Sequence, residues 1–167
     1  NKINLDIFIS SVKDLPLIKG RGLHNIISIN NKKINIIDES YNASPITMKN
    51  SIDYLINYKI KENQKKFLIL GDMYELGNNK LIFHIDILKY IKKKNLDNVI
   101  ICGELMKIAL EKTNNSKIVF MPNIKLILEY LKKFLKNNDI ILIKGSNSSL
   151  TNKLTKELLK KRSKLIV

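Results

Sequence analysis

The sequence predicts an α/β fold in which helices cover both faces of a mostly parallel β-sheet, giving three layers. Short apolar segments alternate along the chain with amphipathic segments of helical length, an order typical of parallel strands joined by right-handed helical crossovers. The apolar segments are continuous rather than alternating, which indicates strands that are buried on both faces. With 167 residues, of which 44% are hydrophobic, the chain is long enough for one domain with a sizeable core.

Five strands are expected, and polar or helix-breaking residues follow most of them. Gly71, Gly103 and Pro122 each come directly after an apolar run and mark its end. In chain order the expected strands are Ile34 to Asp38, Phe67 to Leu70, Val99 to Cys102, Ile118 to Met121 and Ile140 to Ile143.

Five helices are expected between and after these strands. The first begins with Ser44 as its N-cap and Pro45 at its first helical position. Apolar residues at helical spacing then form one face of it, namely Met48, Ile52, Leu55 and Ile56. The other helices are expected at about Asn79 to Lys94, around Leu105 to Ala109, from Ile124 to Leu135 and from Leu150 to Leu158.

The first 23 residues do not follow this pattern. Leu5, Phe8, Ile9 and Val12 have helical spacing, and Leu15 to Gly22 has the composition of an irregular connector. We therefore expect residues 1–23 to be the tail of a preceding domain and its linker. Residues 24–167 are expected to form the α/β domain.

The net charge of +15 raises the question of nucleic-acid binding. Of the 30 basic residues 28 are lysine, and the chain also holds 29 Ile and 21 Asn against two Ala. Lys, Ile and Asn share A/T-rich codons, so this composition is typical of drift in an A/T-rich genome. Nucleic-acid surfaces favour arginine and interleaved aromatic residues, and neither is enriched here. We expect no nucleic-acid partner, although the lysines would attract other polyanions.

Other broad classes are disfavoured by the same composition. The apolar runs are far shorter than the ~20 residues of a membrane-spanning helix, and no signal segment stands at the start. The single cysteine, Cys102, cannot form an internal disulfide or a metal cluster and is expected in the core. We therefore predict a cytoplasmic protein with no membrane insertion and no metal ligands of its own.

Ligands of open α/β sheets bind beyond the carboxyl ends of the strands. This rule selects four polar segments: Asp38 to Asn42, Gly71 to Glu75, Gly103-Glu104 and Lys144 to Asn147. An aspartate at a strand end can accept a hydrogen bond from a ribose hydroxyl, and an asparagine can both donate and accept. The alternative for the first segment is an Asx turn with no ligand.

The other segments suggest charged ligands. Gly71 to Gly77 holds two carboxylates that could bind an amine, or it is a solvated connector. Lys144 to Ser149 opens a helix, which favours an anion, or it is a serine-capped helix start. Gly20-Arg21-Gly22 offers a planar guanidinium for a phosphate, or an interdomain salt bridge. His84, between Leu81 and Leu88, is expected to be structural rather than a general base.

Taken in order, these segments resemble the Mur ligase family, in particular the ligases that add D-alanyl-D-alanine to UDP-N-acetylmuramoyl-tripeptide. Asp38 to Pro45, followed by Met48, is similar to D-D-S-Y-N-A-N-P-x-S-M. Leu70 to Gly77 resembles L-G-D-M-x-E-L-G, with His84 at the matching spacing. Lys144 to Ser148 resembles K-G-S-R-S, and Gly20 to Gly22 matches the G-R-G at the end of the central domain.

The resemblance implies a Rossmann-like C-terminal domain preceded by the tail of a central ATPase domain. It implies that ATP phosphorylates the terminal carboxylate of the UDP-linked tripeptide. The amine of D-alanyl-D-alanine then attacks the acyl phosphate, and ADP and phosphate are released. ATP and Mg²⁺ would be held mainly by the central domain. The 167 residues contain no G-x-x-x-x-G-K-[ST] loop, so the chain alone is predicted to be inactive and to hold no catalytic residue.

Carried over by position, Arg21, Asp38 and Asn42 would bind ATP. The tripeptide or dipeptide substrate would contact Tyr41, Asp72, Lys144, Gly145 and Ser146. Two positions depart from the family pattern, because Ser44 replaces an asparagine and Asn147 replaces an arginine. A monomer is expected. The alternatives are a sibling Mur ligase or a folylpolyglutamate synthetase within the enzymes, and a stand-alone nucleotide- or RNA-binding module outside them.

Overall fold

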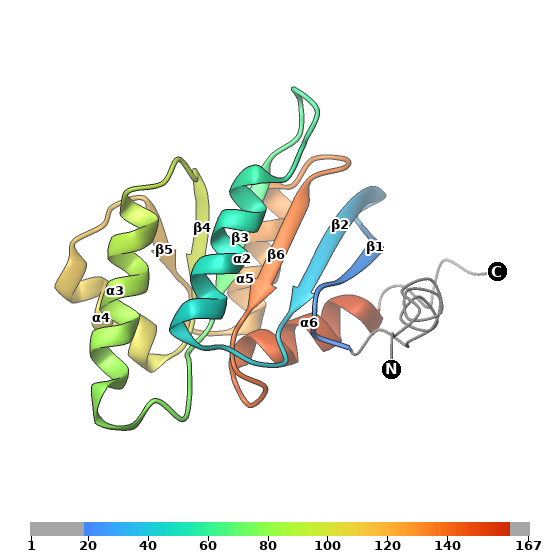
Figure 1. Cartoon of the computed structure of the whole chain (residues 1–167). Helices are drawn as coiled ribbons and strands as arrows, with labels where there is room; N and C mark the ends of the chain where they lie inside the picture. The colour runs from blue at the N-terminus through green and yellow to red at the C-terminus, as the bar shows by residue number, and fades with distance from the viewer. Residues whose placement is uncertain (1–18, 161–167) are drawn as a thin grey trace, which may run out of the picture.

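The computed structural model describes residues 19–160 as a six-stranded sheet flanked by helices (Figure 1). The strands are β1 (Leu23–Ile29), β2 (Lys32–Glu39), β3 (Lys66–Leu70), β4 (Asn98–Ile101), β5 (Ile118–Phe120) and β6 (Ile140–Lys144). The helices are α2 (Pro45–Asn57), α3 (Lys80–Lys92), α4 (Glu104–Thr113), α5 (Ile124–Phe134) and α6 (Leu150–Lys160), with a 3₁₀ turn, η1 (Gly77–Asn79), before α3. The expected α/β class and mostly parallel sheet are confirmed.

The strands lie in the order β1-β2-β6-β3-β4-β5, and all neighbours are parallel except β1 and β2. The sequence analysis missed β1 and assigned no element to residues 24–33. The two strands form a hairpin whose turn residues, Asn30 and Asn31, both have positive φ (49° and 61°). Asparagine tolerates this conformation better than most residues, so an Asn-Asn pair suits such a two-residue turn.

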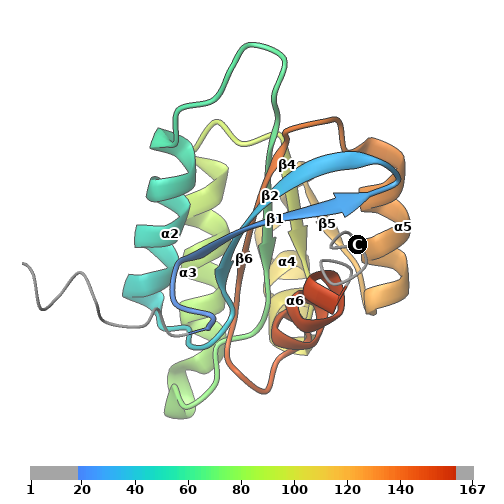
Figure 2. The ribbon, with the colours of Figure 1, turned by 90° about the vertical axis from the view of Figure 1, so that its right-hand side faces the viewer.

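The sheet separates two hydrophobic cores, and Figure 2 shows the helices on either side of it. On one face α2, α3 and α4 bury side chains such as Met48, Leu88 and Met106. On the other face α5 and α6 bury Leu131 and Leu154, among others. Because both faces of the central strands are covered, each strand residue needs an apolar side chain, which explains the continuous apolar runs.

Local signals fix where the helices begin. Ser44 caps α2 as expected: its Oγ accepts from the Thr47 N–H, and the Thr47 hydroxyl oxygen accepts from the Ser44 N–H. Asn123 caps α5 by accepting from the Leu126 N–H. The helix expected from Asn79 begins one residue later, after η1. Among residues 19–160, no helix has the length and apolar character needed to cross a membrane.

The loops after β2, β3, β4 and β6 meet at one edge of the sheet, toward which the arrowheads point in Figure 1. Backbone hydrogen bonds continue past the strand ends and join these loops. The Gly71 N–H donates to the Lys144 carbonyl (2.8 Å), and the Ser146 N–H donates to the Asp72 carbonyl (3.1 Å). The loop after β3 is therefore fixed to the loop after β6.

Candidate functional site at the carboxyl edge of the sheet

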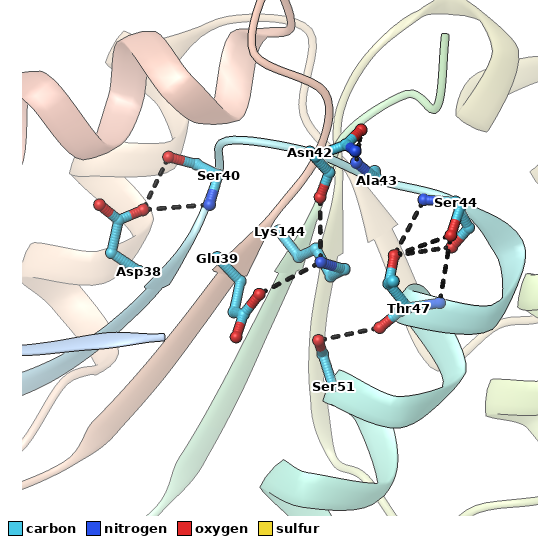
Figure 3. A network of polar contacts seen from close by, with 9 residues as sticks. All are labelled: Asp38, Glu39, Ser40, Asn42, Ala43, Ser44, Thr47, Ser51 and Lys144. Carbon is cyan, nitrogen blue, oxygen red and sulfur yellow. Dashed lines mark hydrogen bonds and ion pairs between the residues drawn. The ribbon is translucent and has the colours of Figure 1, made fainter. Parts of the chain in front are cut away.

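The loop after β2 is shaped by the buried carboxylate of Asp38. One oxygen of this carboxylate, Oδ1, accepts from the Ser40 N–H (3.1 Å) and from the Ser40 hydroxyl (2.7 Å), as Figure 3 shows. Asn152, from α6, donates its side-chain N–H to the Ser40 carbonyl (3.1 Å). The Asx-type turn considered from the sequence is therefore present, and the second oxygen of Asp38 takes no part in it.

The Gly20-Arg21-Gly22 segment is held against this loop. The Tyr41 N–H donates to the Gly20 carbonyl (3.1 Å), and the Gly22 N–H donates to the Asp38 carbonyl (2.8 Å). The Arg21 guanidinium lies 4.8 Å from the centre of the Tyr41 ring. Gly20 has a φ of +81°, and a Cβ there would lie 2.8 Å from the Cβ of Tyr41. Only glycine fits both this backbone conformation and this close approach.

A pocket of about 430 Å³ lies between this loop and α6, and we call it the α6 pocket. Its lining includes Lys19, Asp38, Tyr41, Asn147, Asn152 and Lys156. Leu159 adds an apolar surface. Two lysines, a carboxylate and an apolar wall in one pocket can accept a ligand that carries both a negative group and a hydroxylated or planar part.

Lys144 has an internal position, although we expected it to face the substrate. Its side chain is 2% exposed, and its Nζ donates to Glu39 Oε2 (3.3 Å) and to the Asn42 carbonyl (3.0 Å) (Figure 3). Burial lowers the pKa of the Lys144 ammonium, and the Glu39 carboxylate opposes that shift. The lysine therefore fixes the backbone of the loop after β2 and has no exposed surface for a ligand.

Asp72 also has an internal role. Its carboxylate accepts from the backbone N–H groups of Met106 (2.9 Å) and Leu105 (3.4 Å), at the start of α4. Burial raises the pKa of Asp72, and these backbone donors oppose the shift. Gly103, which has a φ of +103°, passes beneath it, and a Cβ at that position would lie 2.4 Å from the Asp72 Cγ. The carboxylate that we expected to bind substrate therefore caps a helix.

His84 fixes the backbone of the loop after β3 through a hydrogen bond to Met73. Its Nε2 accepts from the Met73 N–H (2.9 Å), so the proton is on Nδ1, which donates to the Lys80 carbonyl (2.6 Å). Nε2 also lies 3.9 Å from Asp72 Oδ1. Burial lowers the pKa of the His84 imidazole, whereas the Lys80 carbonyl and the Asp72 carboxylate act to raise it. Both ring nitrogens are occupied by backbone groups, as a structural histidine requires.

Gly145 and Ser146, in the loop after β6, have different roles: Gly145 packs in the interior, and Ser146 hydrogen-bonds to the loop after β3. A Cβ on Gly145 would lie 2.2 Å from the Thr151 Oγ1, so this residue is a packing glycine without a free surface. Ser146 accepts from the Tyr74 N–H through its Oγ (2.9 Å), and its own carbonyl accepts from the Ser149 hydroxyl (2.5 Å). Ser146 therefore joins the loops after β3 and β6.

A second pocket, of about 290 Å³, lies where three of the predicted segments meet, and we call it the tyrosine pocket. Its lining includes Tyr41, Asn42, Tyr74, Glu75, Ser146 and Asn147. Tyr41 and Asn147 also line the α6 pocket, so the two pockets adjoin. Glu75 has a φ of +62°, a left-handed conformation that is uncommon for a residue other than glycine and often marks a functional loop.

The structure thus brings Asp38, Tyr41, Asn42 and Ser146 to adjoining pockets, with Arg21 stacked on Tyr41 beside them. It places Lys144 and Gly145 in supporting positions, whereas Asp72 both caps α4 and lines a pocket of about 510 Å³ beside that helix. Sequence reasoning missed the contributions of Tyr74, Asn152 and Glu39. Glu39 stands beside Asp38 in the motif, but its pairing with a residue 105 positions away has no local signal. Among residues 19–160, no group of three His, Cys, Asp or Glu side chains is placed to hold a metal ion.

Comparison with known proteins gives the family. The family described as "Mur ligase, glutamate ligase domain" matches residues 25–147. The UDP-N-acetylmuramoyl-tripeptide–D-alanyl-D-alanine ligase of Buchnera aphidicola subsp. Acyrthosiphon pisum is 33% identical over 90% of this chain. The enzyme of that name from Rickettsia prowazekii is 30% identical, also over 90%. The chain covers 32% of each, so it spans about a third of the length of these relatives.

Solved structures show the same fold. A MurF ligase of Thermotoga maritima in complex with ADP matches with a TM-score of 0.69 and 26% identity, over 93% of this chain and 34% of that one. MurF from Acinetobacter baumannii matches with a TM-score of 0.76 and 22% identity, over 95% and 34% of the two chains. The family match covers most of the chain and includes the loop after β2 and Asn147, which line both pockets. The chain therefore belongs to the Mur ligase family and holds the C-terminal domain of that family.

Proposed function

We propose that this chain is the C-terminal part of an ATP-dependent ligase that joins D-alanyl-D-alanine to UDP-N-acetylmuramoyl-tripeptide through an acyl phosphate, in cytoplasmic peptidoglycan precursor synthesis. The observation that carries this proposal is the convergence of four motif segments on two adjoining pockets at one edge of the sheet. The names of the Buchnera and Rickettsia relatives support the choice of substrates.

The two pockets suit different ligands, one the nucleotide and the other the incoming peptide. The α6 pocket, with Asp38 and two lysines, suits the ribose and phosphates of ATP. Arg21 contacts Tyr41 of its lining, and Asn42, the next residue, lines the adjoining tyrosine pocket. The tyrosine pocket, with Tyr41 and Ser146, suits the incoming peptide. Asp72, Lys144 and Gly145 act as positioning residues that hold the loops around these pockets. A MurF ligase to which this chain is similar is in complex with ADP, which supports a nucleotide ligand for the complete protein.

The remainder of the active site is assigned to a preceding domain. We propose that residues 1–23 are the tail and linker of a central ATP-binding domain and that residues 24–167 form the C-terminal domain; β1 begins at Leu23, one residue before this boundary. Residues 1–18 lie outside those that the structure describes. The Mg²⁺ that accompanies ATP would be held mainly by that domain, as the resemblance to the family implies.

The C-terminal domain would act by closing over the central domain, orienting the amine and excluding water. We further propose that the enzyme is a monomer and that it needs no nucleic-acid partner. A sibling Mur ligase is the second candidate, because a UDP-N-acetylmuramate–L-alanine ligase of Wigglesworthia glossinidia brevipalpis is 28% identical over 94% of this chain.

The test is a ligation assay on the protein that carries this sequence together with the residues that precede it. With ATP, Mg²⁺, UDP-N-acetylmuramoyl-tripeptide and D-alanyl-D-alanine, we expect the pentapeptide product and one ADP per product by chromatography and mass spectrometry. Formation of UDP-N-acetylmuramoyl-L-alanine from L-alanine instead would favour the sibling ligase. The 167-residue chain alone should release no phosphate from ATP, and measurable release would contradict the assignment of ATP chemistry to another domain.

A further inference from the structure

We propose that the tyrosine pocket binds an ammonium group, with the Glu75 carboxylate as its counter-charge and Tyr41 and Tyr74 beside it. This inference rests on the function proposed above, and it assigns the pocket to the amine end of the acceptor dipeptide. It makes Glu75 a specificity-determining residue, which neither the family match nor the names of the relatives indicate.

The charges around the pocket favour a cation. The chain has 30 basic residues against 15 acidic ones, yet among residues 19–160 no lysine or arginine lines this pocket, and Glu75 is the charged residue of that lining. Glu75 makes no hydrogen bond or ion pair with the rest of residues 19–160. The adjoining α6 pocket has the opposite character, since Lys19 and Lys156 line it. Coulomb attraction therefore favours a cationic ligand in the tyrosine pocket and an anionic ligand in the α6 pocket.

The aromatic residues add a second attraction. The side chains of Tyr41 and Tyr74 are 42% and 40% exposed, and both line the pocket. The faces of aromatic rings attract cations. Tyr41 already does so in this structure, because the Arg21 guanidinium lies 4.8 Å from its ring centre. An ammonium group in the pocket would lie beside the Glu75 carboxylate and the Tyr74 ring, and beside the Tyr41 ring that the Arg21 guanidinium already contacts.

Two cations lie near the pocket, Arg21 and Lys144. The Arg21 guanidinium lies 4.8 Å from the centre of the Tyr41 ring and disfavours a second cation on that face of the ring. Lys144 donates to the Asn42 carbonyl from behind the pocket, but it is 2% exposed and its charge is paired with Glu39. Tyr41 and Asn147 line both pockets, so an amine bound beside Glu75 lies next to the pocket assigned to the phosphates. This arrangement would place the nucleophile near the activated carboxyl group before the domains close.

The experiment measures dipeptide binding to the 167-residue chain by calorimetry, with amide chemical shifts as the site readout. D-alanyl-D-alanine and D-alaninamide should both bind and shift the signals of Tyr41, Tyr74 and Glu75. N-acetyl-D-alanyl-D-alanine, which lacks the ammonium group, should not bind. Binding of the dipeptide should also weaken above about pH 8, where α-amino groups lose their proton.

The matched variants are Glu75→Gln and Glu104→Gln. Glu75 and Glu104 both line a further pocket of about 510 Å³ beside α4, but only Glu75 also lines the tyrosine pocket. Glu75→Gln should weaken D-alanyl-D-alanine binding at least about tenfold, whereas Glu104→Gln should change it less than about twofold. Equal binding by Glu75→Gln, a greater loss in Glu104→Gln, binding of the acetylated dipeptide, or no amine binding at all would overturn the proposal.

The outcomes also separate this inference from the proposed function. If the complete protein ligates D-alanyl-D-alanine and Glu75→Gln leaves the KM for the dipeptide unchanged, the ammonium site is wrong and the function stands. If ligation fails while D-alaninamide still binds at Glu75, the function is wrong and the ammonium site stands.

Discussion

The guanidinium of Arg21 lies 4.8 Å from the centre of the Tyr41 ring, and two backbone hydrogen bonds hold the flanking glycines against the same loop. The segment that enters the domain is thus attached to the loop that lines both pockets. In the proposed domain arrangement, this segment would be the linker and would transmit the position of the preceding domain to the site.

Replacing Arg21 by alanine should weaken nucleotide use without unfolding the domain. The side chain is exposed, and a cation–π contact at an exposed site contributes about 0.5–1 kcal/mol, so the melting temperature should change little. A lost charge-assisted hydrogen bond to phosphate should raise the KM for ATP about tenfold or more in the complete protein. Arg21→Lys is the control that keeps the charge but loses the planar fork, and it should recover only part of the effect. Wild-type kinetics in Arg21→Ala would refute the assignment.

Replacing Gly103 by alanine should be strongly destabilising. Its φ is +103°, and a Cβ would lie 2.4 Å from the Asp72 Cγ, so backbone strain and overlap with the capping carboxylate both act. We expect a loss of about 3 kcal/mol or more in the free energy of unfolding measured with urea. Gly77→Ala is a matched control: its φ is +60°, nothing lies within 4 Å of the added Cβ, and it should cost about 1 kcal/mol. Equal losses in the two variants would show that Asp72 is not a steric constraint.

The buried His84 should make stability depend on pH. Burial lowers the pKa of His84 below the usual histidine value of about 6.5, so the unfolded state binds the proton more readily than the folded state. Stability should therefore fall as pH decreases below about 6.5 and continue to fall until the lowered folded-state pKa is passed, with a slope of at most about 1.4 kcal/mol per pH unit.

The measurement is urea unfolding of the chain at several pH values from about 5 to about 8, a range that spans the titration of histidine. His84→Gln should flatten the dependence, whereas His24→Gln, which changes an exposed histidine, should leave the slope in place. Protonation would replace the acceptor at Nε2 by a donor, so the amide signal of Met73 should move in the same pH range. An unchanged slope in His84→Gln would mean that another group is responsible.

Removing Lys144 should destabilise the loop after β2. Lys144→Met leaves the Asn42 carbonyl and Glu39 without their donor, and we expect a loss of about 2–3 kcal/mol in the free energy of unfolding. Combining it with Glu39→Gln should cost less than the sum of the two single changes, which a double-mutant cycle measures. Strict additivity would show that the ion pair does not couple the two strands.

The thiol of Cys102 should not react with thiol reagents until the domain unfolds. It is fully buried in the core, as expected from the sequence, and burial raises the pKa of its thiol to about 12. Because the thiolate is the reactive form, the rate of labelling by a thiol reagent at pH 8 should follow the opening of the fold. Fast labelling of the folded chain would indicate a local opening between β4 and α4.

The sequence by itself determined the layers and the edge at which the site lies. Continuous apolar runs predict doubly covered strands, helical spacing predicts the five helices, and parallel strands place the polar segments after them at one edge. It did not predict β1, because that strand is a hairpin edge whose pairing depends on the Asn30-Asn31 turn and on β2.

Only the tertiary structure decided which polar side chains remain free. Asp72 and Lys144 stand in motif positions like Tyr41 and Asn42, but the start of α4 uses the first and Glu39 pairs with the second. These partners come from segments distant along the chain, and a buried charge must be matched by such partners wherever the fold places them. Local pattern specifies where a polar residue lies along a strand, whereas burial and long-range hydrogen bonds determine whether it can still bind a ligand.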